Sequence, residues 1–457
     1  MNSKVNDKRK PGFLAPEVAL ATFGVRTFGC QMNKSRSEHL AYRLRELGFS
    51  QAEKLENADV VIFNTCAVRE HAAQRAMGII GQFAREHKER NPHSLLVVCG
   101  CLGQLQREKL LEKCKEIDVL AGTHNWEDLP FLIQRAWWEK EKIVAFRETP
   151  PSLYEEKGYW HSNRISAYLP ITFGCDNFCS YCVVPYTTGR QRSKPVEIIE
   201  EEVKNLADNG FREITLLGQN VNSYGRDWGR EEAFEDLLSD IEKWLRGKKI
   251  WLRFLTSHPR DLRRGIVEVV KYSDCICPYF HLPLQAGSNK ILHLMNRGYT
   301  RENYLDKVNL IRQSISGARV GTDIIVGFPG ETDSDFQETL EVVKEAQFDV
   351  AYTYIYSPRP GTGASLLKDD IPLEVKKERL HILNDILRGI YQKKLPRLEG
   401  KIVEVLIDQK EGDLVSGRTA NNLRVYLREA HALEIGEWVE VLLTPGEENK
   451  VYGSVER

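Results

Sequence analysis

The sequence has no apolar run long enough to cross a membrane. A transmembrane helix needs about 20 consecutive apolar residues, and no stretch of the chain approaches that length. The first residues, MNSKVNDKRKPG, are polar and basic and lack the apolar stretch of a secretory signal. The sequence therefore predicts a cytoplasmic protein with no membrane partner.

The chain also lacks an excess of charge of either sign, internal repeats and low-complexity segments. A formal net charge of -1 argues neither for nor against a nucleic-acid partner, because phosphate binding needs only a local basic surface. The 457 residues are 42% hydrophobic and 28% charged. This composition is typical of two or three globular domains with large buried cores.

Ten cysteines are present, and their positions carry most of the information. Structural disulfides are rare in a reducing cytosol. Cysteines that gather near one another therefore indicate metal ligands or catalytic thiols.

The first part of the chain alternates between strand and helix patterns. We expect strands at Val25–Gly29, Asp59–Asn64 and Ser94–Gly100. Such alternation predicts a parallel sheet with helices on its faces, and ligand sites in these sheets lie beyond the carboxyl ends of the strands. Cys30, Cys66 and Cys101 all fall there, so three thiols distant in sequence are expected to converge.

A second run of alternating strands and helices follows a charged stretch, residues 125–160, which reads as a connector. Its six strands are expected at Ser166–Phe173, Glu213–Leu217, Ile250–Thr256, Tyr279–Leu284, Arg319–Val326 and Val350–Tyr356. Six consecutive βα units predict a partial (βα)6 barrel. After Gly400 the pattern changes to short strands, expected at Ile402–Ile407, Leu423–Leu427, Trp438–Leu443 and Val451–Val455, which predict a small antiparallel β-barrel.

The strongest single motif is the C-x3-C-x2-C loop of Cys175, Cys179 and Cys182, placed after the first strand of the second run. Three thiolates can hold three corners of a cubane cluster and leave one iron open. Structural zinc needs four protein ligands, and no histidine or further cysteine occurs between Cys182 and His258. A zinc site completed by a remote ligand is the alternative.

This loop, followed by the βα units, resembles the radical S-adenosylmethionine superfamily. The resemblance implies that the open iron binds the amino and carboxylate groups of the cofactor, and that an electron from the cluster cleaves it to a 5′-deoxyadenosyl radical. Tyr181 stands where the superfamily often has an aromatic residue against the adenine. Gln219, Asn220, Gln285 and Asp323 fall near the carboxyl ends of barrel strands, and we expect them to be cofactor contacts, with helix capping as the alternative.

The residues that flank the cysteines narrow the resemblance to one family within this superfamily. Thr27-Phe-Gly-Cys-Gln-Met-Asn33, Asn64-Thr-Cys-Ala-Val-Arg69 and Cys99-Gly-Cys-Leu-Gly-Gln104 resemble the amino-terminal domain of methylthiotransferases. In that family Cys30, Cys66 and Cys101 would hold a second 4Fe–4S cluster, the docking point for the transferred sulfur. All six cysteines are thus expected to be metal ligands with a catalytic role. Cys99 is the only rival to Cys101, and a buried thiol is its preferred interpretation.

Within the family the chain looks like the MiaB branch, which acts on isopentenylated adenosine in tRNA. The residues that resemble this branch are Gln31-Met-Asn33, Gly218-Gln-Asn-Val-Asn-Ser-Tyr224 and Met295-Asn-Arg-Gly-Tyr299. Thr188 departs from the family, which usually has arginine there. Two sister branches, acting on threonylcarbamoyl-adenosine and on a ribosomal-protein aspartate, are alternatives. A non-catalytic RNA-binding protein stabilised by metal clusters is an alternative of another class.

The resemblance to the MiaB branch implies a substrate, a product and the steps between them. N6-isopentenyladenosine at tRNA position 37, beside the anticodon, would become its 2-methylthio derivative through methylation of cluster-bound sulfur and radical activation of the C2–H bond. One S-adenosylmethionine would donate the methyl group and another would generate the radical, with an electron from an external donor such as flavodoxin or ferredoxin.

Three domains are expected from these patterns: an amino-terminal methylthiotransferase domain (24–140), a radical S-adenosylmethionine domain (161–393) and a carboxyl-terminal domain (394–457). The last one, with Gly417-Arg-Thr-Ala-Asn-Asn422 between strands, resembles the TRAM module, an RNA-binding barrel. Arg418, Arg424 and Arg428 are its candidate phosphate or sugar contacts, and a purely structural cap is the alternative.

Overall fold

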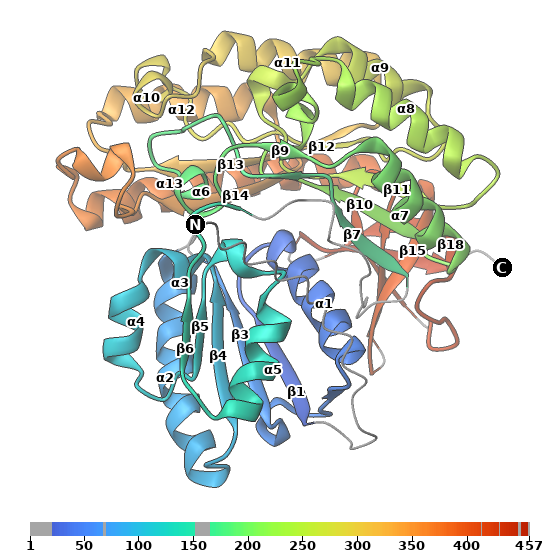
Figure 1. Ribbon diagram of the computed structural model, residues 1–457. Coiled ribbons are helices and arrows are strands. Elements are labelled where there is room, and N and C mark those ends of the chain that lie inside the picture. Colours follow the sequence, from blue (N-terminus) through green and yellow to red (C-terminus); the bar gives the residue numbers. More distant parts are fainter. Residues whose placement is uncertain are drawn as a thin grey trace, which may run out of the picture.

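The structure, a computed structural model, describes residues 21–66, 70–150, 165–412, 414–428, 430–446 and 449–455. These residues form an N-terminal sheet, a central partial barrel and a C-terminal barrel (Figure 1). No helix in these ranges combines the length and the apolar character that a membrane span requires. The domain boundaries at 24–140, 161–393 and 394–457 stay a prediction.

The N-terminal sheet is six-stranded and entirely parallel, with strand order β2-β1-β3-β4-β5-β6. Its elements are β1 (Thr22–Thr27), α1 (Gln31–Glu46), β2 (Ser50–Gln51), β3 (Val60–Thr65), α2 (Glu70–Arg90), β4 (Leu95–Gly100), α3 (Cys101–Leu105), α4 (Arg107–Lys113), β5 (Val119–Ala121), α5 (Leu129–Glu139) and β6 (Ile143–Ala145). Alternate strand residues pack into separate cores on the two faces, so both faces are covered.

The expectation of a connector at 125–160 is wrong for its first half. Helix α5 packs its apolar side, with Ile133 and Ala136 fully buried, on the sheet, and β6 pairs with β5. The charged residues between these elements lie on the solvent side of a short helix and an edge strand, which explains why the stretch reads as polar. The remainder, from residue 151 to 164, lies outside the described residues.

The central partial barrel has six parallel strands in sequence order, as expected. They are β7 (Ser166–Pro170), β10 (Glu213–Leu217), β11 (Trp251–Phe254), β12 (Tyr279–His281), β13 (Arg319–Val326) and β14 (Val350–Ile355). β7, β10 and β11 form one sheet and β12, β13 and β14 another, and a parallel bridge from Leu252 to Ile276 connects them. A hairpin of β8 (Thr172–Phe173) and β9 (Arg192–Ser193) flanks the cysteine loop.

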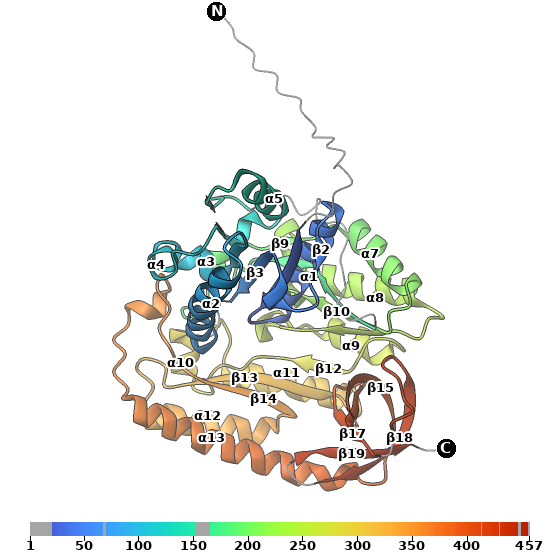
Figure 2. The same ribbon diagram turned by 90° about the horizontal axis from the view of Figure 1, so that it is seen from below.

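Helices cover the outside of the partial barrel. They are α7 (Val196–Asp208), α8 (Ala233–Leu245), α9 (Arg264–Tyr272), α10 (Asn289–Leu294), α11 (Arg301–Ser314), α12 (Asp333–Ala346) and α13 (Leu373–Lys394). The short α6 (Val184–Thr187) follows the cysteine loop and contacts α3 of the N-terminal unit. The long α13 packs on β14 and leads to the C-terminal barrel (Figure 2).

The C-terminal barrel is closed, with strand order β15-β16-β17-β19-β18. Its strands are β15 (Ile402–Glu411), β16 (Leu414–Thr419), β17 (Arg424–Leu427), β18 (Trp438–Pro445) and β19 (Val451–Val455). Four of the five strand pairs are antiparallel, as expected, and β17 pairs with β19 in parallel. β16 has no counterpart among the strands that the sequence predicts.

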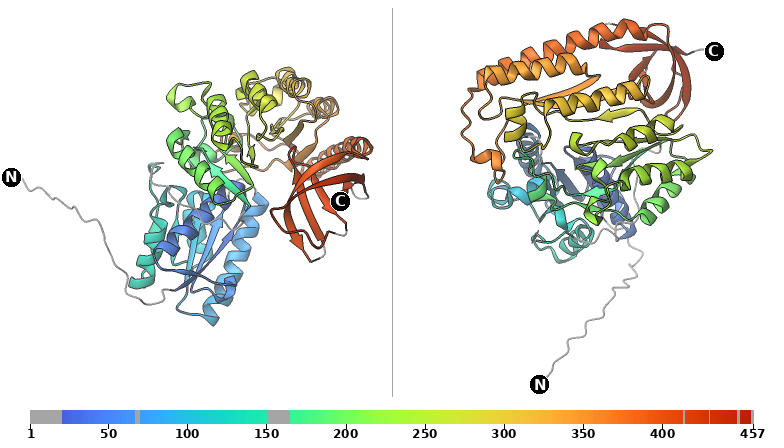
Figure 3. Two further views of the ribbon diagram at one scale, coloured as in Figure 1. Left: turned by 90° about the vertical axis from the view of Figure 1, so that its right-hand side faces the viewer. Right: turned by 90° about the horizontal axis from the view of Figure 1, so that it is seen from above.

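The C-terminal barrel lies beside the central unit (Figure 3), and a buried ion-pair network fixes it there. The carboxylate of Glu213, the first residue of β10, pairs with Arg253 of β11 at 2.5 Å and with Arg418 of β16 at 2.7 Å. Arg253 also donates hydrogen bonds to the carbonyl oxygens of Thr419 and Ala420. Glu213 and Trp251 begin their strands, so the barrel docks at the strand ends opposite the cysteine loop.

Burial alone would raise the pKa of Glu213, but the charges of Arg253 and Arg418 outweigh it and lower the pKa to about 2. We therefore expect Glu213→Gln to destabilise the protein by about 3–5 kcal/mol, because the buried Arg253 loses its counter-charge and Arg418 keeps only Asp408. Thermal unfolding at neutral pH measures this. The effect should shrink as the pH falls from about 4.5 toward 2, where the native carboxylate is itself protonated.

The matched control is Glu404→Gln, which removes a solvent-exposed ion pair with Lys249 across the same interface. Exposed pairs contribute only about 0–1 kcal/mol. Equal destabilisation by the two substitutions would contradict the anchoring role of Glu213.

Candidate active site

Cys30, Cys66 and Cys101 follow three adjacent strands of the N-terminal sheet. Cys30 is the N-cap residue of α1, Cys66 follows the last residue of β3, and Cys101 begins α3 directly after β4. Because β1, β3 and β4 are neighbours in a parallel sheet, their carboxyl ends share one edge. The structure thus brings these three cysteines to the same edge.

Two asparagines hold the loops that carry these cysteines. Asn33 donates to the carbonyl oxygens of Phe28 and Thr65, at 2.9 and 3.0 Å. Asn64 donates to the carbonyl oxygen of Asn33 and to Ser37 Oγ, at 2.8 and 2.9 Å. Both asparagines belong to the quoted motifs, but their role requires the spatial pairing of α1 with β3, which the sequence alone does not give.

The thiols of this set differ in surroundings. Cys66 and Cys101 are buried and Cys30 is exposed. A hydrogen bond from Cys66 is the largest of the effects that lower the pKa of Cys30 to about 6. A thiol that ionises near neutral pH is a ready metal ligand, because the thiolate is the ligating form. Cys99 lies fully buried in the sheet core, and burial raises its pKa.

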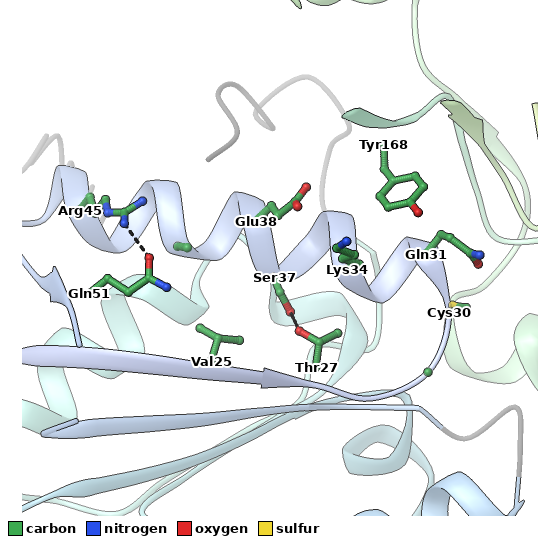
Figure 4. A pocket seen from close by; sticks show the side chains of 12 residues that line it. Val25, Thr27, Cys30, Gln31, Lys34, Ser37, Glu38, Arg45, Gln51 and Tyr168 are labelled. Atoms are coloured by element: carbon green, nitrogen blue, oxygen red, sulfur yellow. Dashed lines mark hydrogen bonds between the residues drawn. The ribbon is translucent and has the colours of Figure 1, made fainter. Parts of the chain in front are cut away.

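A cavity of about 690 Å³ runs along α1 and reaches Cys30. Figure 4 shows Cys30 and Gln31 at one end of it and Arg45 with Gln51 at the other. Tyr168 of β7 contributes to its lining, so the cavity lies between the N-terminal sheet and the central barrel. The cavity gives small molecules a route to the Cys30 sulfur.

Gly29 leaves no space for a side chain beside this set. Its φ is +104°, and a Cβ atom there would lie 2.3 Å from Cys66 Cβ. We expect Gly29→Ala to displace Cys66 and to abolish iron binding by the N-terminal set while the second set keeps its iron. Iron content and electron paramagnetic resonance of the reconstituted protein measure this.

Gly247→Ala is the control, because its φ is +77° and no atom lies within 4 Å of the added methyl group. It carries the same backbone cost, about 1–2 kcal/mol, without the clash. Full iron content in the Gly29 variant would show that the set tolerates movement of Cys66.

Cys175, Cys179 and Cys182 form the second set, in the loop after β8. Cys175 and Cys179 are buried and Cys182 is partly buried. Burial raises the pKa of Cys175 to about 11 and that of Cys182 to about 12. These thiols are therefore costly to ionise alone, and a bound cation would lower that cost.

The segment Met295–Tyr299 clasps this loop from the outside. The carbonyl oxygen of Met295 accepts from the Ser180 amide at 3.0 Å, and Asn296 donates to the carbonyl oxygen of Phe178 at 2.9 Å. Arg297 donates from Nη1 to the Sγ atom of Cys179 at 3.2 Å. The sequence singled this segment out, but it did not indicate a contact with a cysteine 118 residues away.

Residues next to the two cysteine sets pack together across the contact between the two units. Met32, two residues after Cys30, packs against Phe173, two residues before Cys175, and against Leu217 at the end of β10. Arg36 of α1 lies over the rings of Trp126 and Phe173, with centroid distances of 5.7 and 5.8 Å. The carboxyl ends of both sheets therefore meet at one place.

Unpartnered polar atoms surround the mouth of the partial barrel. Within the described ranges, the buried atoms without a hydrogen-bond partner include four that follow β7, β10 and β11: Thr172 Oγ1, Gln219 Oε1, Ser257 Oγ and His258 Nε2. Burying such groups without partners is costly, so a polar ligand is indicated there. The amino, carboxylate and hydroxyl groups of S-adenosylmethionine fit this requirement.

The other expected cofactor contacts have protein partners. Asn220 donates to Asp261 at 2.7 Å and accepts from the His258 amide, so it holds the loop after β11. Asp323 lies 3.0 Å from His281 Nε2. The main chain of Gln285, at φ +73°, bonds to Asp323 and Ile325. Tyr181 packs on the apolar cluster around α10.

Two iron–sulfur cubanes stay the prediction for the six cysteines. Among the described residues, no three histidine, cysteine or acidic side chains are close enough to ligate one ion. The three thiolates of a cubane bind three different irons, so they stand farther apart than the ligands of a single ion.

The comparisons with known proteins give the family. The Radical SAM superfamily matches residues 169–343, and uncharacterized protein family UPF0004 matches residues 22–122. The tRNA-2-methylthio-N(6)-dimethylallyladenosine synthase of Geobacillus kaustophilus is 42% identical over 92% of this chain and 80% of its own length. The enzyme of the same name from Thermoanaerobacter pseudethanolicus is 43% identical over 92% of this chain and 90% of its own.

The chain belongs to this family of synthases. It is therefore a radical S-adenosylmethionine transferase, and the resemblance to the MiaB branch is confirmed. Among solved structures, the radical S-adenosylmethionine methyltransferase TsrM from Kitasatospora setae has a TM-score of 0.58 at 14% identity, covering 76% of this chain and 77% of its own. That likeness supports the fold, as expected from the six βα units.

Proposed function

We propose that this synthase converts N6-isopentenyladenosine at tRNA position 37 to its 2-methylthio derivative in the cytoplasm. The observation that carries the proposal is the apolar contact between Met32, two residues after Cys30, and Phe173, two residues before Cys175. The target base must reach a sulfur donor and a radical source in one binding event, and this arrangement supports both. When bound, two 4Fe–4S clusters and S-adenosylmethionine supply the sulfur, the methyl group and the radical that activates the C2–H bond.

The chain's own residues bind, orient and exclude water. Cys30, Cys66 and Cys101 hold the cluster that receives sulfur, and Cys175, Cys179 and Cys182 hold the cluster that binds S-adenosylmethionine. Gln219 and His258 offer unpartnered polar atoms to the cofactor. Burial and nearby arginines lower the pKa of His258 well below its usual value, so it acts as a neutral hydrogen-bonding group. An external donor such as flavodoxin or ferredoxin supplies the electron.

Nucleoside mass spectrometry tests the proposal. tRNA from cells that lack the gene should contain isopentenyladenosine without its methylthio group, and the full-length chain should restore that group. The control is the same chain with Cys175→Ala, which should not restore it. A methylthio group gained instead by threonylcarbamoyl-adenosine or by a ribosomal protein would contradict the substrate assignment.

The C-terminal barrel is the proposed tRNA contact, and the structure narrows its candidate residues. Arg418 pairs with Glu213 and Asp408, and Arg424 pairs with Asp408, so both have protein partners. Arg428 is exposed and lies over the ring of Tyr452, 4.6 Å from its centroid. A guanidinium beside an aromatic ring suits both phosphate and an unstacked base.

We expect Arg428→Ala to weaken tRNA binding and to reduce the slope of log affinity against log salt by about 1, the value for one lost phosphate contact. Binding curves across a salt series measure both. Arg190→Ala is the comparison, because Arg190 is an exposed basic residue beside the cysteine loop, where it pairs with Asp176. An effect of Arg190→Ala alone would place the tRNA contact at the barrel mouth and make the C-terminal barrel a structural cap.

A further inference from the structure

Four arginines are buried in the part of the chain that the structure describes: Arg36, Arg253, Arg297 and Arg379. Arg253 and Arg379 each pair with a buried carboxylate, Glu213 at 2.5 Å and Glu331 at 2.8 Å. A buried charge is costly unless an opposite charge compensates it, and these two arginines follow that rule.

Arg297 does not follow it. The side chain is 5% exposed, and no carboxylate in the described ranges lies within ion-pair distance of it. Its guanidinium donates instead to Cys179 Sγ at 3.2 Å, to the carbonyl oxygen of Pro283 at 3.0 Å and to the Tyr299 hydroxyl at 3.1 Å. All its protein partners are neutral unless the thiol is ionised.

We infer that Arg297 is the fixed counter-charge of the cluster held by Cys175, Cys179 and Cys182, and that it makes this cluster easier to reduce. The inference rests on the proposed function, because it requires that cluster. Cysteine thiolates give the cluster negative charge, and reduction adds one more electron from the external donor. A buried cation bonded to a ligand sulfur favours the reduced state, since net charge and hydrogen bonds to sulfur set the potential.

The site is suited to this role because the cation cannot move. Tyr299 OH, which accepts from Arg297, is itself fixed by donation to the carbonyl oxygen of Leu284 at 2.7 Å. The same hydroxyl lies 3.2 Å from the carbonyl oxygen of Pro283. The single proton of this hydroxyl can serve only one of the two carbonyls, so replacing Arg297 by a neutral side chain of similar length leaves one carbonyl oxygen without its donor. Arg297 is accordingly a positioning residue that acts through Cys179.

The first test is a redox titration of the reconstituted protein followed by electron paramagnetic resonance. At a fixed donor potential, Arg297→Met should lower the ratio of reduced to oxidised central cluster at least tenfold, a shift of about 59 mV for one electron. Arg297→Lys should recover most of the shift because it keeps the charge. The N-terminal cluster, whose cysteines do not contact Arg297, serves as the internal reference.

The control is Arg260→Met. Arg260 also contacts the cysteine loop, through Asn177, but its side chain is 39% exposed and is paired with Asp261. Solvent screens such a charge, so this variant should leave the potential unchanged. Equal shifts in the Arg260 and Arg297 variants, or no shift in the latter, would overturn the inference.

A second measurement separates counter-charge from plain structural support. In the cluster-free chain Arg297 is an uncompensated buried cation, so Arg297→Met should leave the unfolding midpoint unchanged or raise it. In the loaded chain the same substitution should lower the midpoint. A fall in both states would mean that Arg297 only supports the loop. If the wild-type chain itself binds no iron at Cys175, Cys179 and Cys182, the proposed function fails. If the cluster forms but its reduction potential does not change when Arg297 is replaced, only the inference about Arg297 fails.

Discussion

Replacing Cys175, Cys179 and Cys182 together by alanine should remove half of the iron and abolish cleavage of S-adenosylmethionine. The wild-type chain should hold about eight irons in two cubanes, and only the central set lies beside the unpartnered polar atoms of the barrel mouth. Anaerobic reconstitution, iron analysis and chromatography of 5′-deoxyadenosine measure the outcome.

Alanine is well tolerated sterically at these positions, so loss of folding is a poor explanation for a negative result. The matched control is Cys277→Ala, which removes a fully buried thiol outside both sets. A triple variant that keeps all its iron would show that the loop is not a cluster site.

The second large effect is expected from alanine at Cys30, Cys66 and Cys101. This variant should still cleave S-adenosylmethionine, yet it should form no methylthio product. The reason is structural: these cysteines sit on the N-terminal sheet, and none of the hydrogen bonds that pin the central loop comes from that sheet. The methylthio product in tRNA and the 5′-deoxyadenosine from cleavage are measured in the same reaction.

Loss of cleavage in a folded variant of this kind would mean that the two sets do not act separately. Cys99→Ala is the companion control. Its thiol lies in the sheet core, so iron content should stay at the wild-type value. A loss of iron there would assign the ligand to Cys99 in place of Cys101.

Strand patterns in the sequence predicted the central barrel well, because β10 and β11 are buried along their whole length. β10 and β13 have the bounds expected from the apolar pattern. β16 was missed because Ser416, Gly417 and Arg418 interrupt its alternation, and Gly417 is required where the strand passes close to Leu406. Barrel closure, which no local pattern encodes, makes this segment a strand.

The sequence predicted those parts of the candidate site whose residues lie close together in the chain or at strand ends. Three cysteines in one short loop indicate a cluster without a structure, and strand ends indicate where distant cysteines converge. Arg297 escaped sequence reasoning because nothing in an arginine between Asn296 and Gly298 reports burial or the absence of a carboxylate. The sequence predicted Arg418 and Arg424 as RNA contacts because it does not show their partner. Both pair with Asp408 of β15, a contact between strands that only the folded barrel brings together.

The ion pairs that anchor the C-terminal barrel have a consequence for folding during synthesis. Glu213 and Arg253 are synthesised long before Arg418, Thr419 and Ala420, to which they bond. A nascent chain that ends in α13 has completed all six strands of the partial barrel, but the amino ends of β10 and β11 still expose an arginine and a half-satisfied carboxylate to water. The segment Arg418–Ala420, which is made later, therefore supplies the groups that satisfy the amino ends of β10 and β11.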